Sequence, residues 1–272
     1  MKLRRRARGS PRCERAGAWL FGAHRTRERF APLPPELYPQ DPADAYAIQS
    51  EYVRLRAREL GTLVGYKIAL TTPAMRAMVG LDEPIAGEML ERAVRRGPAR
   101  VRAADYGRLI VEFEIAVQMG EDLPAMDAPY SRERVAQAVT AVMPALELAD
   151  DRNADYAQLP ANVLMLIADN GWNEGAVLGE PVRDWHGIDL AALEGTASIN
   201  GERVGQGHGR DTMGHPFEAL AWVANNLASR GLGLWRNDIV ITGSLVTSKY
   251  PKAGDHIRFE AGSLGAVELQ VD

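Results

Sequence analysis

The pattern of apolar and polar positions is clearest over residues 109–119, which read LIVEFEIAVQM. Apolar side chains occupy every odd-numbered position, while the even-numbered positions include Glu112, Glu114 and Gln118. An alternation with a period of two predicts a β-strand, because successive side chains of a strand point to opposite faces. With a rise of about 3.3 Å per residue, the two glutamates share one face and their α-carbons lie about 7 Å apart.

Two carboxylates on one face of such a strand require an explanation. Like charges repel each other and burial adds a desolvation cost, so the pair needs solvent, basic partners or a cation. The ordinary interpretation is the solvated outer face of a half-buried strand. A third glutamate, Glu147, stands in a similar apolar frame, PALEL, about thirty residues further on. Three carboxylates suit a hard cation such as Mg²⁺ or Mn²⁺, but the spacing alone does not decide between these interpretations.

Proline and glycine mark the ends of the predicted helices. Asp41 and Pro42 form an N-cap acid followed by proline at the first helical position, and Gly61 ends the helix that begins there. A proline-rich connector, residues 32–42, precedes this helix. The same reasoning predicts helices over 42–60, from Pro73 to Gly80, from Ser131 through Val135, Ala138, Val139 and Val142, and from Pro216 to Arg230.

Shorter runs of β-forming residues predict further strands. Residues 196–207, TASINGERVGQG, form the clearest hairpin, because Asn200 and Gly201 suit a two-residue type I′ turn. Strands dominate the second half of the chain, so the predicted fold class is α+β, with a mostly β core and helices packed around it. The other predicted strands are residues 63–70, 143–150, 175–182, 238–244, 255–261 and 266–272.

Composition places the chain among globular proteins, with 46% apolar and 25% charged residues in 272. The single cysteine, Cys13, excludes an internal disulfide framework and a cysteine-based zinc site. Residues 1–30 carry ten Lys and Arg against two Glu, which leaves about −12 for the remainder of a chain whose net charge is −4. The acidic body argues against nucleic acid as a partner, and no apolar run is long enough to span a membrane.

The basic N-terminal region allows several interpretations. A secretory or twin-arginine signal and a transit peptide both fit poorly, because the apolar run is short and acidic residues interrupt the region. We expect a disordered basic tail over residues 1–15, followed by a helix that places Ala18, Leu20 and Phe21 against the body. The predicted organisation is a helical N-terminal part over residues 16–65 and a β-rich catalytic core over residues 66–272.

Nine sequence blocks suggest a family. They are GYKIALTTPAM, GLDEP, VEFEIAV, PALELAD, ADNG with VLG, NGERVGQG, MGHPFEALAWVANNLA, DIVITGS, and PKAGDHIRFE with LGAVELQV. In this order they closely resemble the 2-keto-4-pentenoate hydratase branch of the fumarylacetoacetate hydrolase superfamily. The resemblance runs from about Ala16 to the C-terminus, and nine ordered blocks are far more specific than any single motif.

The resemblance implies a mixed β-roll or barrel-like core with a helical N-terminal part and one bound divalent cation, Mg²⁺ or Mn²⁺. It implies that Glu112, Glu114 and Glu147 are the metal ligands. It also implies that Lys67 and Asp82 carry protons during catalysis. From the residues alone, the alternatives are a surface lysine on an edge strand and a turn residue before a proline.

The resemblance further implies that the ADNG block approaches the substrate, which makes Asp169 and Asn170 candidate substrate-binding residues. This chain then departs from the family, because it continues with GWNEG where the hydratases have small residues and a serine. Trp172 is expected to contact the substrate and Glu174 to change the charge of the pocket. The alternative is a tight loop in which Trp172 packs against a neighbouring residue.

Residues 241–248, ITGSLVTS, provide two more candidates for substrate binding. Ser244 and Thr247 are expected to hydrogen-bond a substrate carboxylate near the metal, although Gly243 has the alternative role of permitting a bend. Four histidines show no paired spacing and are expected to be structural: His186, His208, His215 and His256. No histidine and glutamate pair follows TTPAMRAM, which favours addition of water over hydrolysis of a carbon–carbon bond.

The resemblance therefore implies a cytoplasmic, divalent-metal-dependent hydratase, a hydro-lyase that acts on a small 2-hydroxydienoate or 2-keto acid in the catabolism of aromatic compounds. The alternatives are a 4-oxalocrotonate decarboxylase, an acylpyruvate hydrolase, and an inactive ligand-binding relative or complex partner. The implied assembly is a homo-oligomer, or a complex with a decarboxylase or hydratase relative. Neither nucleic acid nor a membrane is expected as a partner.

Overall fold

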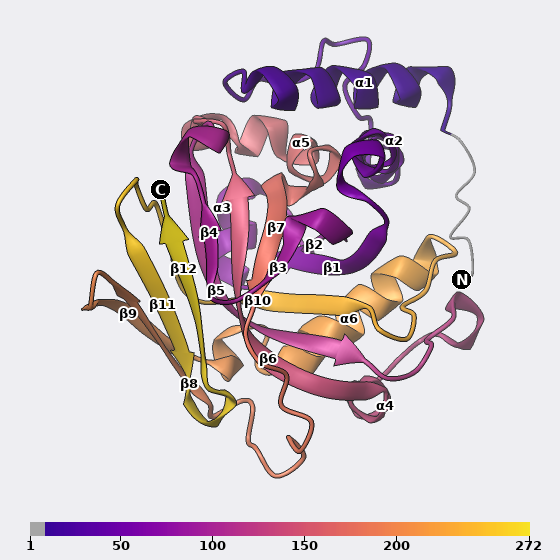
Figure 1. The fold of residues 1–272 in the computed structure, drawn as a ribbon. Coiled ribbons are helices and arrows are strands. Elements are labelled where there is room, and N and C mark those ends of the chain that lie inside the picture. Colours follow the sequence, from indigo (N-terminus) through magenta and orange to yellow (C-terminus); the bar gives the residue numbers. More distant parts are fainter. Residues whose placement is uncertain (1–8) are drawn as a thin grey trace.

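The computed structural model describes residues 9–272, which form two mixed β-sheets surrounded by helices (Figure 1). The larger sheet contains, in spatial order, β2 (Ile85–Leu90), β1 (Leu63–Ala69), β10 (Ile239–Lys249), β5 (Leu109–Met119), β6 (Val139–Asp150), β7 (Asn173–Leu178) and β3 (Val94–Arg96). The smaller sheet contains β4 (Ala99–Val101), β12 (Ala266–Val271), β11 (His256–Ala261), β8 (Glu194–Ile199) and β9 (Glu202–His208). The predicted α+β class with a mixed β core is confirmed, but the described strands form two sheets rather than a closed barrel.

Three helices cover one end of the larger sheet (Figure 1). They are α1 (Pro11–Thr26), which packs on α2 (Pro42–Leu60), and α5 (Val163–Ala168), which packs on the other side of α2. The other helices are α3 (Pro73–Val79), α4 (Arg132–Gln137) and α6 (Pro216–Ser229), of which α6 packs against β10 and β1. None of the helices in residues 9–272 combines the length and apolar character that crossing a bilayer requires.

The N-terminal helix begins earlier than predicted. Residues 1–8 of the predicted tail lie outside the described part of the chain, but α1 already starts at Pro11, where the Ser10 hydroxyl accepts a hydrogen bond from the N–H of Cys13. The boundary at residue 15 is therefore corrected, because a serine cap followed by proline is itself a strong helix start. Leu20 is buried as predicted, whereas Ala18 is exposed.

Most predicted boundaries are confirmed, including the Asp41 cap of α2 and the positive φ angles of Asn200 and Gly201 in the β8–β9 hairpin. The helix predicted from Ser131 to Val142 is wrong in its second half. It ends at Gln137, and Val139 begins β6, which pairs with β5 along its whole length. Pairing with a central strand overrides the local helical spacing, since β-branched residues suit either structure. Strand β2 and helix α5 were not predicted.

The central position of β5 decides how its two glutamates are placed. Phe113 on its odd-numbered face contacts Phe259 of β11 in the smaller sheet, with ring centroids 5.7 Å apart. On the opposite face, Glu114 has no exposed surface and Glu112 is half-buried. The interpretation of this face as solvated is therefore wrong, because Glu114 and Ala116 on this face are both fully buried.

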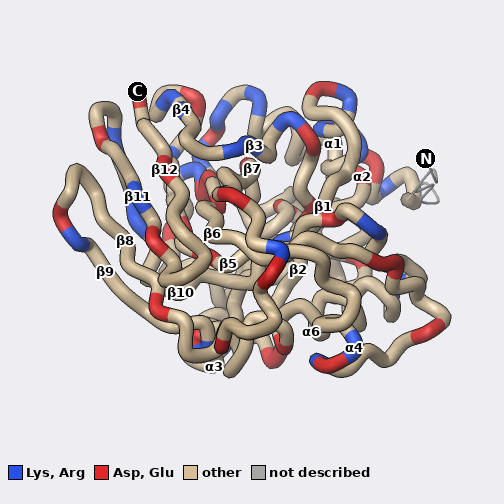
Figure 2. Tube along the Cα trace, turned by 60° about the horizontal axis from the view of Figure 1, so that its bottom comes forward, with Lys and Arg blue, Asp and Glu red and all other residues tan. Residues whose placement is uncertain are grey.

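Charged residues of both signs are interspersed along the chain in the view of Figure 2. Such mixing is typical of a solvated protein surface. It differs from the single basic stripe that marks many nucleic-acid-binding proteins.

Candidate metal centre

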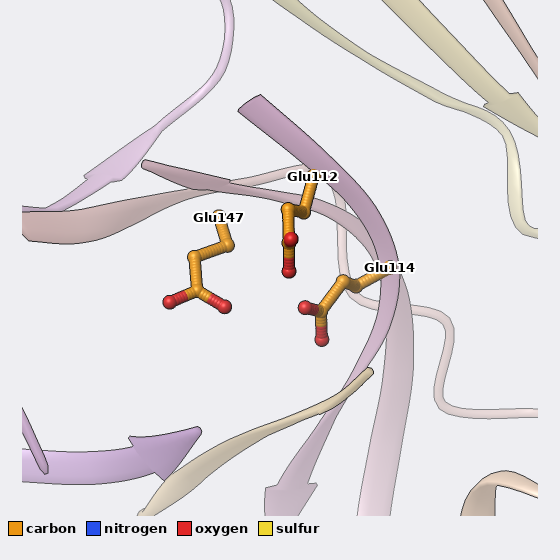
Figure 3. A group of neighbouring side chains, drawn as sticks. All are labelled: Glu112, Glu114 and Glu147. Atoms are coloured by element: carbon orange, nitrogen blue, oxygen red, sulfur yellow. The ribbon is translucent and has the colours of Figure 1, made fainter. Parts of the chain in front are cut away.

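The three predicted metal ligands lie together on two neighbouring strands (Figure 3). Glu112 of β5 lies directly opposite Glu147 of β6, and Glu114 follows two residues later on the same face of β5. One carboxylate oxygen from each glutamate lies within 4.8 Å of the others. The antiparallel register thus brings together residues that are far apart in sequence.

Two of these carboxylates have oxygens without a hydrogen-bond partner among the described residues. Glu114 Oε2 accepts a hydrogen bond from the N–H of Gly243 at 2.6 Å, while its Oε1 is buried and unpaired. Glu147 Oε1 accepts from Lys67 Nζ at 3.1 Å and from Asn173 Nδ2 at 2.9 Å, while its Oε2 is also buried and unpaired. Buried polar atoms are normally satisfied, so these oxygens fit a site for a hard cation.

The electrostatics of the cluster indicate the same need for positive charge. Burial, followed by repulsion from Glu147 and Glu112, raises the pKa of Glu114 well above its usual value. Burial is also the main reason why the pKa of Glu147 rises to about 6. Burial lowers the pKa of Lys67, but attraction to the three carboxylates outweighs it and the net pKa is raised. One ammonium faces three carboxylates, and a divalent cation would balance the remaining charge.

An irregular segment of β10, which pairs with β5 on the edge opposite β6, hydrogen-bonds two of the glutamates. Gly243 has a φ of 103°, and the β5–β10 register shifts around it. This conformation directs its N–H to Glu114, while the hydroxyl of Ser248 donates to Glu112 Oε1 at 2.6 Å. The Thr71 side chain lies against Gly243, where an added Cβ would be 2.5 Å from Thr71 Cγ2. The same conformation of Gly243 therefore bends β10 and makes the hydrogen bond to Glu114.

We expect Gly243→Ala to lower both stability and divalent-cation affinity. The positive φ and the clash with Thr71 each disfavour a side chain, and together they predict a loss of about 2 kcal/mol or more in the free energy of unfolding. Gly254→Ala is the matched control, because Gly254 has a φ of 96° and no heavy atom within 4 Å of the added Cβ. Thermal unfolding and Mn²⁺ titration measure the two effects. Equal losses in both variants would show that the contact with Thr71 is unimportant.

The other predicted site residues differ in burial and in their distance from the carboxylate cluster. Lys67 on β1 is buried beside Glu147, whereas Asp82 is exposed on the turn between α3 and β2 and is not part of the carboxylate cluster. Thr247 is exposed. The Ser244 hydroxyl donates to Val246 O at 2.7 Å and accepts from the N–H of Phe113 at 2.9 Å, so its bonds serve the bend in β10. The roles of Asp82 and Thr247 stay predictions.

The polar groups of the ADNG block, which is predicted to bind substrate, are bonded within the protein. Both Oδ1 and Nδ2 of Asn170 hydrogen-bond the backbone of Glu88, at 2.7 and 2.9 Å. The Asp169 carboxylate is fully buried in ion pairs with His24 and Arg152. Trp172 is buried with its ring edge-on to Phe30 and Tyr156, which is the packing alternative. These contacts fit a structural role, and substrate binding by the three residues stays a prediction.

Sequence reasoning missed two side chains that contact the proposed metal ligands, Asn173 and Ser248. It also missed three side chains that contact residues 169–174, namely His24, Arg56 and Arg152. Asn173 stands inside the unusual GWNEG stretch, and this departure from the family pattern is the sequence signal that could have identified it. The Ser248 hydroxyl follows the predicted ITGSLVT candidates. His24, Arg56 and Arg152 carry no local signal, because their partners lie more than fifteen residues away in the chain.

Comparison with known proteins identifies the family. The model of the fumarylacetoacetate (FAA) hydrolase C-terminal domain matches residues 78–272. The chain therefore belongs to the fumarylacetoacetate hydrolase family. It is 34% identical over 260 residues to 2-keto-4-pentenoate hydratase 1 of Dechloromonas aromatica, covering 93% of this chain and 95% of that protein. It is 30% identical to 2-hydroxyhexa-2,4-dienoate hydratase of Comamonas testosteroni, covering 94% and 96% of the two chains.

One solved structure with a similar fold is that of a decarboxylase. The 4-oxalocrotonate decarboxylase of Pseudomonas putida G7, complexed with magnesium and adipate, superimposes with a TM-score of 0.88 and 25% identity. The match covers 98% of this chain and all of that chain. Predicted membership of the hydratase and decarboxylase group is thus confirmed.

Proposed function

We propose that this protein is a divalent-metal-dependent hydratase of a small 2-hydroxydienoate or 2-keto acid, in the catabolism of aromatic compounds. The observation that carries the proposal is the pair of buried, unpartnered oxygens on Glu114 and Glu147, next to the buried ammonium of Lys67. The hydratase names of relatives at 30 to 34% identity over most of the chain support the same reaction. A site built only to stabilise the fold would pair these oxygens.

Glu112, Glu114 and Glu147 would hold the cation, which we propose to be Mg²⁺ or Mn²⁺. The magnesium complex of the related decarboxylase supports a divalent ion. When bound, such an ion supplies Lewis acidity that stabilises the enolate form of a 2-keto acid.

Lys67 is the residue best placed to attract an anionic substrate and to hold a proton near it. Hydration of 2-hydroxypenta-2,4-dienoate begins when C5 gains a proton and the 2-hydroxyl loses one, which gives a conjugated ketone. Water then adds its hydroxyl to C4, and C3 gains a proton. These steps need a donor and an acceptor, and the Nζ of Lys67 carries a proton because its pKa is raised. Asp82 is the predicted second proton carrier.

A substrate assay tests the proposal. Purified protein with Mn²⁺ is expected to remove the ultraviolet absorbance of 2-hydroxypenta-2,4-dienoate and to form 4-hydroxy-2-oxopentanoate without release of CO₂. Pyruvate released from an acylpyruvate would instead indicate carbon–carbon hydrolysis. Mn²⁺-loaded protein that turns over no 2-hydroxydienoate or 2-keto acid would contradict the enzymatic proposal and favour a ligand-binding relative.

Decarboxylation of 4-oxalocrotonate is the second candidate. It is favoured by the similarity to the Pseudomonas putida G7 decarboxylase over 98% of the chain, and by 32% identity to a Pseudomonas putida 4-oxalocrotonate decarboxylase. The two activities use the same enolate, so the carboxylate cluster does not separate them. Release of CO₂ from 4-oxalocrotonate identifies the decarboxylase.

We further propose that the enzyme acts in the cytoplasm as a homo-oligomer or together with a relative from this group. Light scattering of the purified protein measures its oligomeric state.

A further inference from the structure

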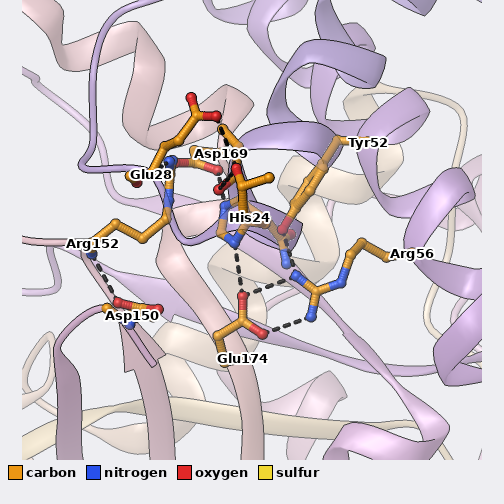
Figure 4. Close-up of polar contacts among 12 residues, drawn as sticks. His24, Glu28, Tyr52, Arg56, Asp150, Arg152, Asp169 and Glu174 are labelled. Carbon is orange, nitrogen blue, oxygen red and sulfur yellow. Dashed lines mark hydrogen bonds and ion pairs between the residues drawn. The ribbon is translucent and has the colours of Figure 1, made fainter. Parts of the chain in front are cut away.

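We propose that residues 169–174, called here the brace segment, position the metal ligand Glu147, and that Asn173 and His24 are the positioning residues. The inference rests on the proposed function, because it concerns the cation that the three glutamates would hold. Asn173 contacts Glu147 directly, and His24 of α1 holds the brace segment on both sides of a strained turn (Figure 4).

The brace segment contains three consecutive residues in the left-handed conformation. Asn170, Gly171 and Trp172 have φ angles of 57°, 55° and 60°. Non-glycine residues are strongly disfavoured in this region, so the turn persists only where its surroundings impose it. The Asn170 amide bonded to the backbone of Glu88 and the packing of the Trp172 ring supply part of that constraint.

His24 supplies the remaining constraint by joining the two ends of the turn. Its Nε2 lies 2.6 Å from Asp169 Oδ1, and its Nδ1 lies 3.0 Å from Glu174 Oε1. Arg152 approaches the other oxygen of Asp169 at 2.5 Å, and Arg56 binds Glu174 through two hydrogen bonds of 2.9 and 2.6 Å. The brace segment is therefore held by charged side chains from α1, from α2 and from the chain that follows β6.

The contacts of His24 require a doubly protonated ring, because a neutral imidazole has only one N–H and here both nitrogens face carboxylates. Burial lowers the pKa of His24, but Asp169 and Glu174 outweigh burial and raise it above 6.5. Other charged or titratable groups drawn with His24 in Figure 4 are Glu28, Tyr52, Arg56, Asp150 and Arg152. His24 therefore contributes its full stabilisation below pH 6.5, and this contribution is lost as the pH rises through the raised pKa.

Asn173 orients the carboxylate of Glu147 at the candidate metal centre. Its Nδ2 and Lys67 Nζ both donate to Oε1 of Glu147, which leaves Oε2 as the unpaired oxygen of that carboxylate. The turn also packs on Lys67, since a Cβ added to Gly171 would lie 3.4 Å from Nζ. Residues that orient metal ligands typically change metal affinity by about 10- to 100-fold when they are removed.

A double-mutant cycle on Mn²⁺ affinity tests the proposal. Free Mn²⁺ is measured by electron paramagnetic resonance in titrations of the wild type, Asn173→Ala, His24→Ala and the double variant. Each single variant is expected to bind about 10-fold more weakly. Because His24 acts through Asn173, the double variant should resemble the weaker single variant rather than show the product of both losses. His256→Ala, at a half-exposed histidine paired with Glu268, is the control and should bind like the wild type.

The pH dependence of Mn²⁺ affinity distinguishes a positioning role of His24 from a merely structural one. The affinity difference between the wild type and His24→Ala should be largest at pH values below the raised pKa of His24, and should shrink as the pH rises through that pKa and His24 loses its second proton. If His24→Ala does not fold, His24→Gln replaces it, because glutamine can still donate to one carboxylate but cannot bridge both.

The outcomes separate this inference from the proposed function. A wild type that binds no Mn²⁺ overturns the metal site itself. A wild type that binds Mn²⁺ together with single variants of unchanged affinity overturns the positioning role alone. Fully multiplicative losses in the double variant would show that His24 acts independently of Asn173, and would overturn the link between them.

Discussion

Glu114→Gln is expected to eliminate Mn²⁺ binding and turnover while the metal-free protein stays folded and is at least as stable as the wild type. Glu114 is fully buried, and one of its oxygens has no hydrogen-bond partner among the described residues. The loss of affinity should exceed the about 100-fold effect of residues that only support ligands. Glu112→Gln should likewise abolish binding, since it also removes a proposed ligand.

The expected stability follows from the sign of the pKa shift. Burial, and then repulsion from Glu147 and Glu112, raises the pKa of Glu114 above its ordinary 4.5. A carboxyl group whose pKa is raised by folding opposes folding at every pH above its ordinary value, so a neutral amide in its place removes this penalty from the metal-free state at pH 7. Calorimetry in the presence of a chelator measures the resulting gain in the free energy of unfolding, which we expect to be on the order of 1 kcal/mol.

Asp151→Asn is the matched control for Glu114→Gln. Asp151 is equally buried but is held by Arg108 and by the hydroxyl of Tyr156. Removing a buried acid that is paired should destabilise the protein and leave Mn²⁺ affinity unchanged. If Glu114→Gln destabilises the metal-free protein as much as Asp151→Asn does, Glu114 is a structural residue and not a ligand.

Lys67→Met is expected to lower kcat by about 10²- to 10⁴-fold, the usual contribution of a positioned proton donor or acceptor. Mn²⁺ affinity should be retained or increased, because the substitution removes a positive charge 3.1 Å from Glu147. The metal-free protein should become less stable, since three carboxylates would then share a buried site without a basic partner. Steady-state kinetics, Mn²⁺ titration and thermal unfolding measure the three effects.

Lys252→Met, at an exposed lysine, is the control and should change none of these quantities. A Lys67→Met enzyme with the kcat of the wild type would remove Lys67 from the catalytic steps. A variant that lost both kcat and Mn²⁺ affinity would instead indicate that Lys67 acts by organising the carboxylates.

The structure brings the predicted metal ligands together, and the sequence could single them out because their signals are local or ordered. The alternation around Glu112 and Glu114 identifies β5, and the family blocks relate that strand to Glu147 and Lys67. Local patterns did not reveal the contacts that Asp169, Asn170 and Trp172 make with residues distant in the chain. Their motif resembles a substrate loop, whereas the partners that occupy it lie on α1, on β2 and around Phe30.

The sequence by itself determined the strands, the ends of the main helices, the family and the identity of the three proposed ligands. These features depend on backbone periodicity, on capping by proline and glycine, and on ordered motifs, all of which are written along the chain. Only the tertiary structure decided that the glutamate face of β5 is buried, that Val139 belongs to a strand, that Asn173 donates to Glu147, and that His24 bridges Asp169 and Glu174. Each of these outcomes depends on strand register and on charge pairing between residues far apart in the chain, which local patterns do not encode.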